Sequence, residues 1–457
     1  MPACAACAAP AALACGACAA PYCSAACQRA AWPAHKSACR AAAAARAAAA
    51  AVAAQAKIHA EILTACSQCA APLRRGAPPH ECTCCRTVAY CGVECQRAAW
   101  GGHKGVCRAA GEAKFAATMA RAEAGDASAV FSVGIDYELG TGVAADMREA
   151  VKWYARAAEA GYIDAQYNLG NSFEKGKGVS VDKREAAKWY KRAAEAGHLD
   201  AQYNLGHVYS DGASDVADAC EAVRAWTRAA EAGHARAQNA LGVCYRDGKG
   251  IAADARAAVE LFTRAAGAGD SVAQVNLGAC YFFGTGIAAD AHAAVRWFTR
   301  AAEAGDASAQ FNLGLCLEKG TGVAADARAA VKWYTRAAEA GDTAAQGKLG
   351  VCYEKGTGVA ADARAAVNWY TRAAEAGHTD AQSNLGVCFI NGTGTAADAR
   401  AAVKWFTRAA DAGHAAAQYN LGVCYEQGTG VAADMREAFK RYTRAAEAGH
   451  AGAMCLL

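Results

Sequence analysis

Residues 306–341 read DASAQFNLGLCLEKGTGVAADARAAVKWYTRAAEAG, and close copies of this stretch fill most of the 457-residue chain. One glycine marks the same place in every copy, at Gly134, Gly170, Gly206, Gly242, Gly278, Gly314, Gly350, Gly386 and Gly422. These glycines are each 36 residues apart, so nine full units occupy residues 126–449 without an insertion. A fixed period of this length is the sequence signature of a stacked repeat architecture.

The first half of the unit predicts an amphipathic helix. Ala309, Leu313 and Leu317 follow one another at intervals of four residues, which places them on one face of a helix. Asp306 is a natural N-cap for that helix, and Gly320 is a natural C-terminal stop.

The second half of the unit predicts another helix. After the turn sequence GTGVAAD, Asp326 can cap a helix that ends at Gly341. The apolar positions of this helix are Val331, Tyr334 and Ala338. Each unit is therefore expected to contain two antiparallel helices.

A single helix pair cannot bury its own apolar face, so the units must stack. Small residues such as Gly314 and Ala337 allow the helices to approach closely where they cross. We therefore expect an all-α fold, a right-handed α-solenoid of helix-turn-helix repeats over residues 126–450. Residues 109–125 end in AEAGD, in register with the units, and predict a degenerate capping helix. Residues 451–457 begin a tenth unit and stop.

The third unit departs most from the common pattern. Its second part reads DGASDVADACEAVRAWTRAAEAG, which lacks the second turn glycine and shifts the tryptophan to Trp226. We expect a distorted turn in this unit.

Six cysteines lie two residues after the repeated glycine, at Cys244, Cys280, Cys316, Cys352, Cys388 and Cys424. Equivalent positions on stacked helices are about 8–10 Å apart, which exceeds the limit of about 7 Å between the Cα atoms of a disulfide. These cysteines are therefore expected to be small, buried packing residues rather than a redox or metal site.

The sequences AQYNLG and W-Y-x-R-A-A-E-A-G, in recognisable form throughout residues 126–450, resemble the Sel-one-like repeat, a relative of the tetratricopeptide repeat. The resemblance implies a role in holding other proteins together. By the same resemblance, the first helix of each unit lines the concave side of the solenoid.

Two rows of first-helix positions vary along the chain while the Leu-Gly core does not. The first row comprises Phe131, Tyr167, Tyr203, Asn239, Val275, Phe311, Gly347, Ser383 and Tyr419. The second row comprises Ile135, Asn171, His207, Val243, Ala279, Leu315, Val351, Val387 and Val423. Divergence in a copied unit marks positions that stacking does not dictate. Exposed aromatic residues in the first row, namely Tyr167, Tyr203, Phe311 and Tyr419, are candidate anchors for a bound peptide.

A third row is nearly constant and consists of Asn168, Asn204, Asn276, Asn312, Asn384 and Asn420. These amides could form a ladder that bonds the backbone of an extended peptide. Alternatively, they could tie adjacent helices together inside the solenoid. The sequence alone leaves both interpretations open, and Asn168, Asn204, Asn312 and Asn420 are retained as candidate peptide contacts.

The N-terminal region holds 15 of the 23 cysteines, all before residue 108. The stretches CQRAAWPAHKSAC (27–39) and CQRAAWGGHKGVC (95–107) share the skeleton C-x7-H-x3-C. Short Cys pairs suit zinc, because a tight turn directs two thiolates at one tetrahedral ion. Eight ligands per set predict two ions per set and four zinc ions in all. A disulfide framework is the alternative, but it requires an oxidising compartment and does not explain the repeated histidine.

The two sets resemble the MYND-type zinc finger over residues 4–39 and 66–107, in the order of seven Cys and one His. RING fingers instead finish with a C-x2-C pair. The resemblance implies cross-braced pairing. In the first finger the ligand sets are then Cys4, Cys7, Cys23 and Cys27, and Cys15, Cys18, His35 and Cys39. In the second finger they are Cys66, Cys69, Cys91 and Cys95, and Cys82, Cys85, His103 and Cys107. Cys84 remains as a spare thiol.

We therefore expect the solenoid to be preceded by two small cross-braced zinc fingers, at residues 1–40 and 64–108. Residues 41–63 between them are rich in alanine, the best helix former, and predict a helical linker. In the MYND family, residues at the places of Gln28, Trp32, Gln96 and Trp100 contact proline-containing peptides. The alternative is that each Trp packs against the zinc core.

Charge and hydropathy exclude two classes of partner. Residues 1–125 carry 13 Lys and Arg against 5 Asp and Glu. Once the ligand thiolates and zinc ions are counted, the formal +8 of this region falls to about +2, so direct nucleic-acid binding is not expected. No apolar run is long enough to cross a bilayer, and the N-terminus lacks the basic region of a signal peptide. A cytoplasmic or nuclear location is expected, where thiols stay reduced.

These features predict a non-enzymatic adaptor that binds proteins or peptides through both its fingers and its solenoid. A transcriptional co-regulator recruited through partner proteins is the alternative, and an accessory subunit of a modifying enzyme is a third hypothesis. No phosphate loop, nucleophile elbow or metal-hydrolase motif is present, so no catalytic residues are proposed. Histidines recur at the unit junctions, where they alternate with Asp and are interpreted as helix-start residues: His198, His234, His378, His414 and His450.

Overall fold

A computed structural model describes residues 93–211 and 218–455, together with four two-residue strands nearer the N-terminus. Side chains are described from residue 108 onward. Most of the predicted finger ligands and the alanine-rich linker at 41–63 lie outside the described residues.

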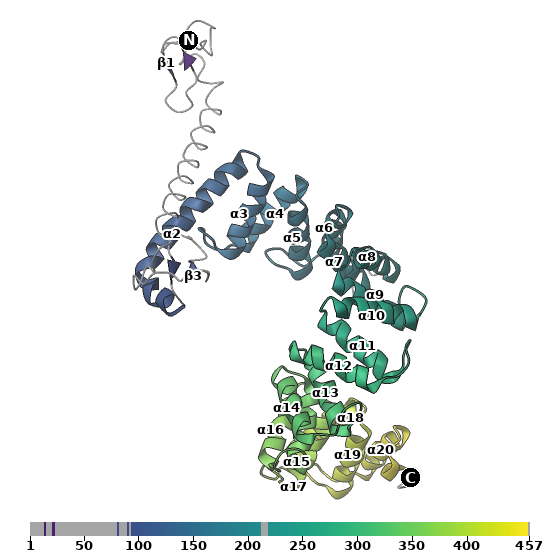
Figure 1. The fold of residues 1–457 in the computed structure, drawn as a ribbon. Coiled ribbons are helices and arrows are strands. Elements are labelled where there is room, and N and C mark those ends of the chain that lie inside the picture. The colour runs from purple at the N-terminus through teal and green to yellow at the C-terminus, as the bar shows by residue number, and fades with distance from the viewer. Residues whose placement is uncertain are drawn as a thin grey trace. The chain divides into compact units, whose positions relative to one another are not determined.

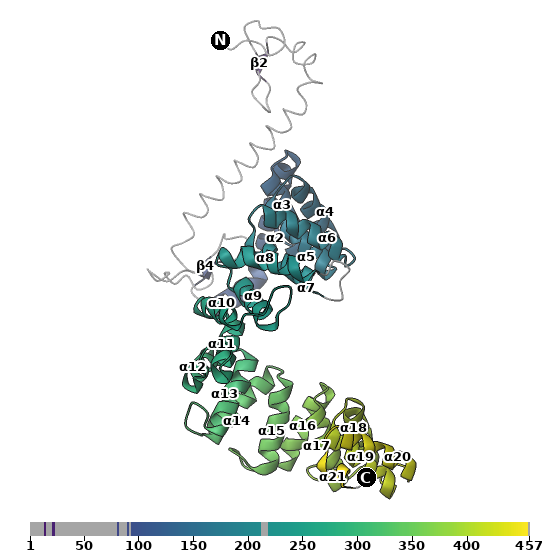
Figure 2. The same ribbon diagram turned by 90° about the vertical axis from the view of Figure 1, so that its right-hand side faces the viewer.

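The chain forms two compact units, Met1–Asp218 and Ala219–Leu457. Figures 1 and 2 show that, from residue 127 onward, the described part of each unit consists of helices that follow one another as antiparallel pairs. The expected α-solenoid of helix-turn-helix repeats is therefore confirmed. No described helix combines the length and the apolar character that spanning a membrane requires.

The first compact unit begins with two small antiparallel hairpins. Their strands are β1 (Leu13–Ala14), β2 (Pro21–Tyr22), β3 (His80–Glu81) and β4 (Ala89–Tyr90). β1 pairs with β2, and β3 pairs with β4. The helices of this unit are α2 (Val93–Glu123), α3 (Ala127–Leu139), α4 (Met147–Glu159), α5 (Ile163–Lys175), α6 (Lys183–Glu195) and α7 (Leu199–Ser210).

The second compact unit continues the same helix pairs. Its helices are α8 (Ala219–Glu231), α9 (Ala235–Asp247), α10 (Ala255–Gly267), α11 (Ser271–Phe283), α12 (Ala291–Glu303), α13 (Ala307–Lys319), α14 (Ala327–Glu339), α15 (Thr343–Lys355), α16 (Ala363–Glu375), α17 (Thr379–Asn391), α18 (Ala399–Asp411), α19 (Ala415–Gln427), α20 (Met435–Glu447) and α21 (Ala451–Met454). Each helix packs against the next in sequence.

The helix ends lie where the capping residues predict them. The Asp306 carboxylate accepts a hydrogen bond from the backbone N–H of Ala309 at 2.9 Å, which satisfies one free donor at the start of α13. Gly320 ends α13 in the left-handed region at φ +67°, a conformation that glycine adopts without strain. Asp326 caps α14 in the same way as Asp306 caps α13. Short-range sequence signals therefore fix the helix boundaries of the unit.

The hydrophobic cores lie between neighbouring repeat units. One core joins Val331, Tyr334 and Ala338 of α14 to Leu349 and Cys352 of α15, so the second helix of one unit packs on the first helix of the next. The same arrangement recurs in the neighbouring cores. This confirms that the units stack, because neither helix of a pair buries its apolar face within its own unit alone.

Within a unit, the two helices cross at the repeated glycine. A Cβ atom added to Gly314 would lie 2.5 Å from Cε1 of Tyr334, whose side chain is fully buried. The tyrosine ring therefore rests directly on the backbone of α13. The predicted close approach at Gly314 is confirmed.

This crossing predicts a clear effect of Gly314→Ala. The added methyl group would force the buried Tyr334 ring to move, and we expect a loss of about 1–3 kcal/mol in unfolding free energy. Gly267→Ala is the matched control, because Gly267 is also helical but has open space around it. There we expect a gain of up to about 1 kcal/mol from helix propensity. Urea unfolding followed by circular dichroism measures both, and equal effects of the two substitutions would contradict the close crossing.

The third repeat differs as its sequence suggests. α7 is one residue shorter than the other first helices, and its C-cap Asp211 has extended backbone rather than a left-handed glycine. The turn at residues 212–217 lies outside the described residues. The shifted Trp226 lies 36 residues after Tyr190 and is buried like it, so the tryptophan takes the place of the core aromatic residue.

One continuous helix, α2, spans the expected boundary between the second finger and the capping segment. Its N-terminal half includes Cys95, His103 and Cys107, and its C-terminal half packs on α3. There, the Phe115 ring meets Tyr137 edge-on with 5.5 Å between ring centroids. The segment predicted as a capping helix at 109–125 therefore forms the second half of a longer helix.

Candidate peptide-binding surface

Aromatic residues of the first predicted row are half-buried and pack at the junctions between units. The Tyr167 ring stacks on His198 at 4.5 Å between centroids, and Tyr419 stacks on His450 at 4.6 Å. Phe311 instead contacts the buried Tyr334 ring at 5.8 Å. Each of these rings has at least one partner within the fold, so the part that a peptide could reach is smaller than the sequence suggests.

The junction histidines begin helices, as predicted from their alternation with Asp. His198 accepts a hydrogen bond from the backbone N–H of Ala201 through Nδ1 at 3.2 Å, and His414 does the same with Ala417 at 3.1 Å. The interpretation of these histidines as helix-start residues is confirmed.

A glutamate–tyrosine pair joins the two helices of most units, and the sequence analysis did not find it. The Tyr334 hydroxyl donates to the Glu318 carboxylate at 2.7 Å. Burial and the neighbouring carboxylate raise the pKa of Tyr334 far above its usual range, so the hydroxyl keeps its proton. The other pairs are Glu138–Tyr154, Glu174–Tyr190, Glu354–Tyr370 and Glu426–Tyr442. A constant separation of 16 residues was the only signal in the sequence.

The asparagine row divides into paired and unpaired members. Asn204 donates to the Tyr190 hydroxyl at 3.3 Å, and Asn276 donates to Asn239 at 2.8 Å. These two amides tie adjacent helices together, which supports the structural interpretation at their positions. In the part of the chain with described side chains, Asn312 and Asn420 have no hydrogen-bond partner. Those two amides remain open to a ligand.

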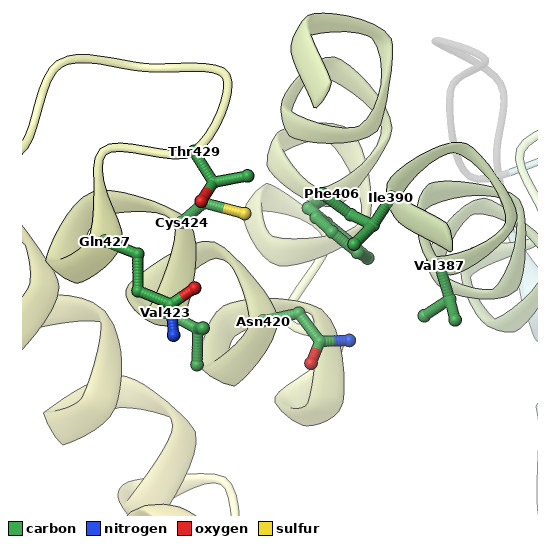
Figure 3. Close-up of a pocket in the computed structure, with 8 residues that line it drawn as sticks. All are labelled: Val387, Ile390, Phe406, Asn420, Val423, Cys424, Gln427 and Thr429. Carbon is green, nitrogen blue, oxygen red and sulfur yellow. The ribbon is translucent and has the colours of Figure 1, made fainter. Parts of the chain in front are cut away.

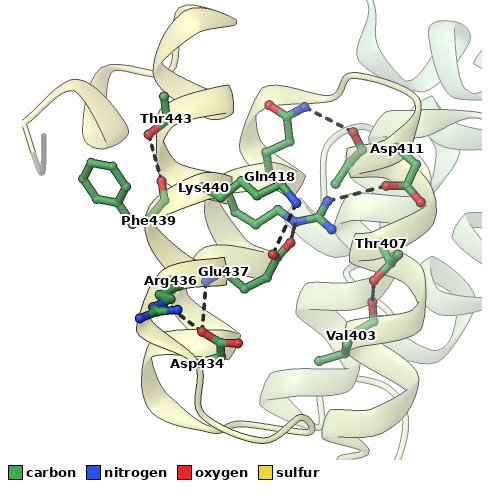
Figure 4. Close-up of polar contacts among 12 residues, drawn as sticks. Val403, Thr407, Asp411, Gln418, Asp434, Arg436, Glu437, Phe439, Lys440 and Thr443 are labelled. Carbon is green, nitrogen blue, oxygen red and sulfur yellow. Dashed lines mark hydrogen bonds and ion pairs between the residues drawn. The ribbon is translucent and has the colours of Figure 1, made fainter.

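A buried glutamine in each first helix from α5 to α19 forms a further tie. Gln418 Nε2 donates to the Ala410 carbonyl at 3.2 Å, across the junction between α18 and α19 (Figure 4). The carbonyl lies in the last turn of its helix and also accepts the backbone N–H of Gly413 at 3.0 Å, so the glutamine adds a second hydrogen bond to it. The same bond recurs for Gln166, Gln202, Gln238, Gln274, Gln310, Gln346 and Gln382. The constant Gln of AQYNLG therefore has a structural role that the sequence analysis missed.

A cavity of about 210 Å³ lies between α17, α18 and α19. Figure 3 shows the side chains that surround it, which are Val387, Ile390, Phe406, Asn420, Val423, Cys424, Gln427 and Thr429. Val387 and Val423 belong to the second predicted row, and Asn420 is one of the unpaired amides. The structure thus brings members of two predicted rows together around one hollow.

Comparison with known families supports these assignments. A family model described as the Sel1 repeat matches nine consecutive 36-residue segments from residue 127 to residue 450. The chain belongs to the Sel1 repeat family. The MYND finger model matches residues 4–39 and 66–107, the same ranges as the expected fingers. The predicted combination of two MYND fingers and Sel1 repeats is therefore confirmed.

Solved structures share the Sel1 architecture. The protective antigen c5321 of uropathogenic Escherichia coli, which has an SLR fold, is 36% identical over 74% of this chain and 72% of its own, with a TM-score of 0.58. A Sel1 repeat protein from Oxalobacter formigenes is 32% identical over 67% of this chain and 88% of its own, with a TM-score of 0.50. No curated protein matches the sequence.

The six cysteines that lie two residues after the repeated glycine are buried and carry free thiols. Burial raises their pKa values, and that of Cys388 reaches about 11 with a further contribution from Glu354. A protonated, inaccessible thiol is a poor nucleophile and a poor metal ligand. The expected packing role agrees with this burial. The residues with described side chains contain no cluster that could hold a metal ion.

MYND fingers are zinc-binding domains, and the described backbone of both fingers fits that role. In each finger the two strands of the hairpin flank the second Cys pair in the sequence: Cys15 and Cys18 come between β1 and β2, and Cys82 and Cys85 come between β3 and β4.

In the second finger, the helix α2 carries the last predicted ligand pair. His103 and Cys107 lie four residues apart on α2, and therefore on one helix face. Gln96 and Trp100, the predicted peptide contacts of this finger, lie on the same helix. The other predicted ligands, with Gln28 and Trp32, lie outside the described residues.

Proposed function

We propose that this Sel1 repeat protein is a non-enzymatic adaptor that holds partner proteins along the first helices of its repeats. The observation that carries this proposal is the contrast between constant and variable positions. The core glycine and the Gln tie recur in unit after unit, while the two first-helix rows change from aromatic to aliphatic to polar residues. Sel1 solenoids and MYND fingers are typically non-catalytic interaction modules, which supports the same conclusion.

The MYND fingers supply a second binding surface in this proposal. Four zinc ions, two in each finger, would be held by the sixteen Cys and His ligands predicted above and would stabilise the fold without taking part in chemistry, since each ion has four protein ligands. Gln28, Trp32, Gln96 and Trp100 are the proposed contacts to proline-containing peptides. Thiolate ligands need a reducing compartment, in agreement with a cytoplasmic or nuclear adaptor. Two linked sites of modest strength raise the affinity for a partner that reaches both.

Cross-linking in the native cells tests the adaptor role. Exposed lysines at the ends of first helices, Lys175, Lys319 and Lys355, are expected to cross-link to co-purified partner proteins. Exposed lysines on second helices serve as the matched control set, at Lys152, Lys332 and Lys404. We expect several-fold more partner cross-links on the first set, as read by mass spectrometry. Failure to recover any reproducible partner, or cross-links confined to the second set, would refute the proposed function.

A further inference from the structure

Two repeats carry apolar residues in place of both members of the glutamate–tyrosine pair, Phe282 with Phe298 in one and Ile390 with Phe406 in the other. Ile390 stands where the preceding unit has Glu354, and Phe406 stands where it has Tyr370. The preceding pair fills its space with a hydrogen bond of 2.8 Å between hydroxyl and carboxylate. The exchange removes both polar groups, and the cavity between α17, α18 and α19 lies at this place.

The exchange also leaves an amide without its partner. In the first compact unit, Asn204 donates to the hydroxyl of Tyr190. Asn420 holds the equivalent position next to Phe406, which has no hydroxyl to offer. Its amide therefore keeps two donors and one acceptor free at the edge of the hollow.

The cavity has a closed apolar base and an open side. Phe406 and Cys424 are almost fully buried, at 2% and 3% exposure, whereas Val387 is 37% exposed. In Figure 3, Asn420 lies between Val423 on one side and Val387 on the other. No lining side chain carries a charge, so a charged occupant would lose its hydration without gaining a counter-ion.

We propose that this cavity binds one uncharged aliphatic side chain of an extended partner segment, and that the Asn420 amide bonds to the backbone of the same segment. The proposal rests on the adaptor function and specifies one of its contact sites. An extended peptide presents an apolar side chain and a backbone amide a few ångströms apart, which matches an apolar base beside a free amide. Continuity with the second first-helix row, through Val387 and Val423, lets the segment continue across the neighbouring repeats.

Selection from a displayed library of random nine-residue peptides, on the full-length zinc-loaded protein, tests this site. We expect the selected peptides to share one aliphatic position. The double substitution Ile390→Glu with Phe406→Tyr restores the pair that the preceding unit already accommodates, and we expect it to weaken these peptides at least tenfold. Asn420→Ala keeps the apolar base but removes the amide, and we expect a loss of about fivefold.

A reciprocal variant provides a gain of binding. Glu354→Ile with Tyr370→Phe introduces the same two apolar residues into the preceding unit. We expect an equivalent cavity to form there, and the same peptides to bind it as a second site. Thermal unfolding verifies that each double variant stays folded. If the Ile390→Glu, Phe406→Tyr protein does not fold, Val387→Asp at the open side replaces it and is expected to weaken the peptides at least tenfold.

Three outcomes would overturn the proposal. They are selected peptides with a charged residue at the shared position, equal binding to the restored-pair variant, and failure to select any peptide. A cavity that takes decanol but no peptide would instead be a small-molecule site, which also overturns the proposal. The cross-linking experiment does not depend on any of these outcomes. It therefore tests the adaptor function separately from this contact site.

Discussion

Removal of zinc with a chelator is expected to unfold both MYND fingers while most of the helical circular dichroism remains. Each finger is too small to bury a self-sufficient core, and structural zinc contributes about 10–16 kcal/mol to the folding of comparable finger peptides. The Sel1 helices bury their own cores between units, so we expect them to stay folded without metal. Native mass spectrometry should therefore count four ions before chelation and none after it.

The continuous helix α2 makes this expectation more specific. Its first half, residues 93–107, carries predicted ligands, while its second half is held on α3 through Phe115 and Tyr137. Hydrogen exchange should therefore rise after chelation over residues 93–107 and stay low from Phe115 to Glu123. Loss of helix throughout the chain would show that fingers and repeats do not fold independently.

Paired cysteine substitutions provide the control for the zinc experiment. Cys107→Ser removes a proposed ligand and should lower the ion count by one. Cys84→Ser removes the spare thiol of the same finger and should leave the count at four. An unchanged count in the Cys107→Ser protein would refute the proposed ligand set.

Tyr334→Ala should cause a large loss of stability in the repeats. The side chain is fully buried against Gly314 and joins Glu318 to the core. Replacing a large buried aromatic residue with alanine costs about 3–5 kcal/mol, because a cavity remains. Contacts in a repeat array run only between neighbours, so faster hydrogen exchange should be concentrated in α13, α14 and α15.

Tyr334→Phe is the matched control for this loss. Phe262, Phe298 and Phe406 occupy the same place in other units, so the ring itself fits. The substitution deletes one hydrogen bond, and Glu318 keeps Lys348 as a partner at 3.0 Å. We therefore expect a loss of about 1 kcal/mol or less. Similar losses for Phe and Ala, measured by urea unfolding, would show that the hydroxyl rather than the ring stabilises the crossing.

The helices could be predicted from sequence because their boundaries depend on local chemistry. Asp306, Gly320 and Asp326 act on backbone groups within a few residues, and the apolar period of the unit gives the buried face directly. The continuity of α2 was harder to foresee, because Gly101 and Gly102 lower helix propensity within the second finger. Packing of the second half of α2 on α3 supports the helix on one side of these glycines.

The candidate site could be predicted only in part. Repetition revealed which first-helix positions vary, and the structure places Val387, Asn420 and Val423 around one cavity. The repeat pattern did not reveal that Tyr167 would stack on a helix-capping histidine. It also did not reveal that a Glu and a Tyr of the two helices of one unit would form a hydrogen bond. Those contacts depend on the angle at which two helices cross, which no short stretch of sequence encodes.

The unbroken 36-residue period has a consequence for how such a gene can change. From residue 235 onward each repeat makes the same Gln tie and the same glycine crossing, so an in-frame duplication or deletion of one whole period there leaves these contacts chemically intact. Unequal recombination between near-identical copies can therefore lengthen or shorten the protein while it remains foldable. The repeat that carries Ile390 and Phe406 would therefore be duplicated or lost as one unit, together with the residues that it contributes to the cavity.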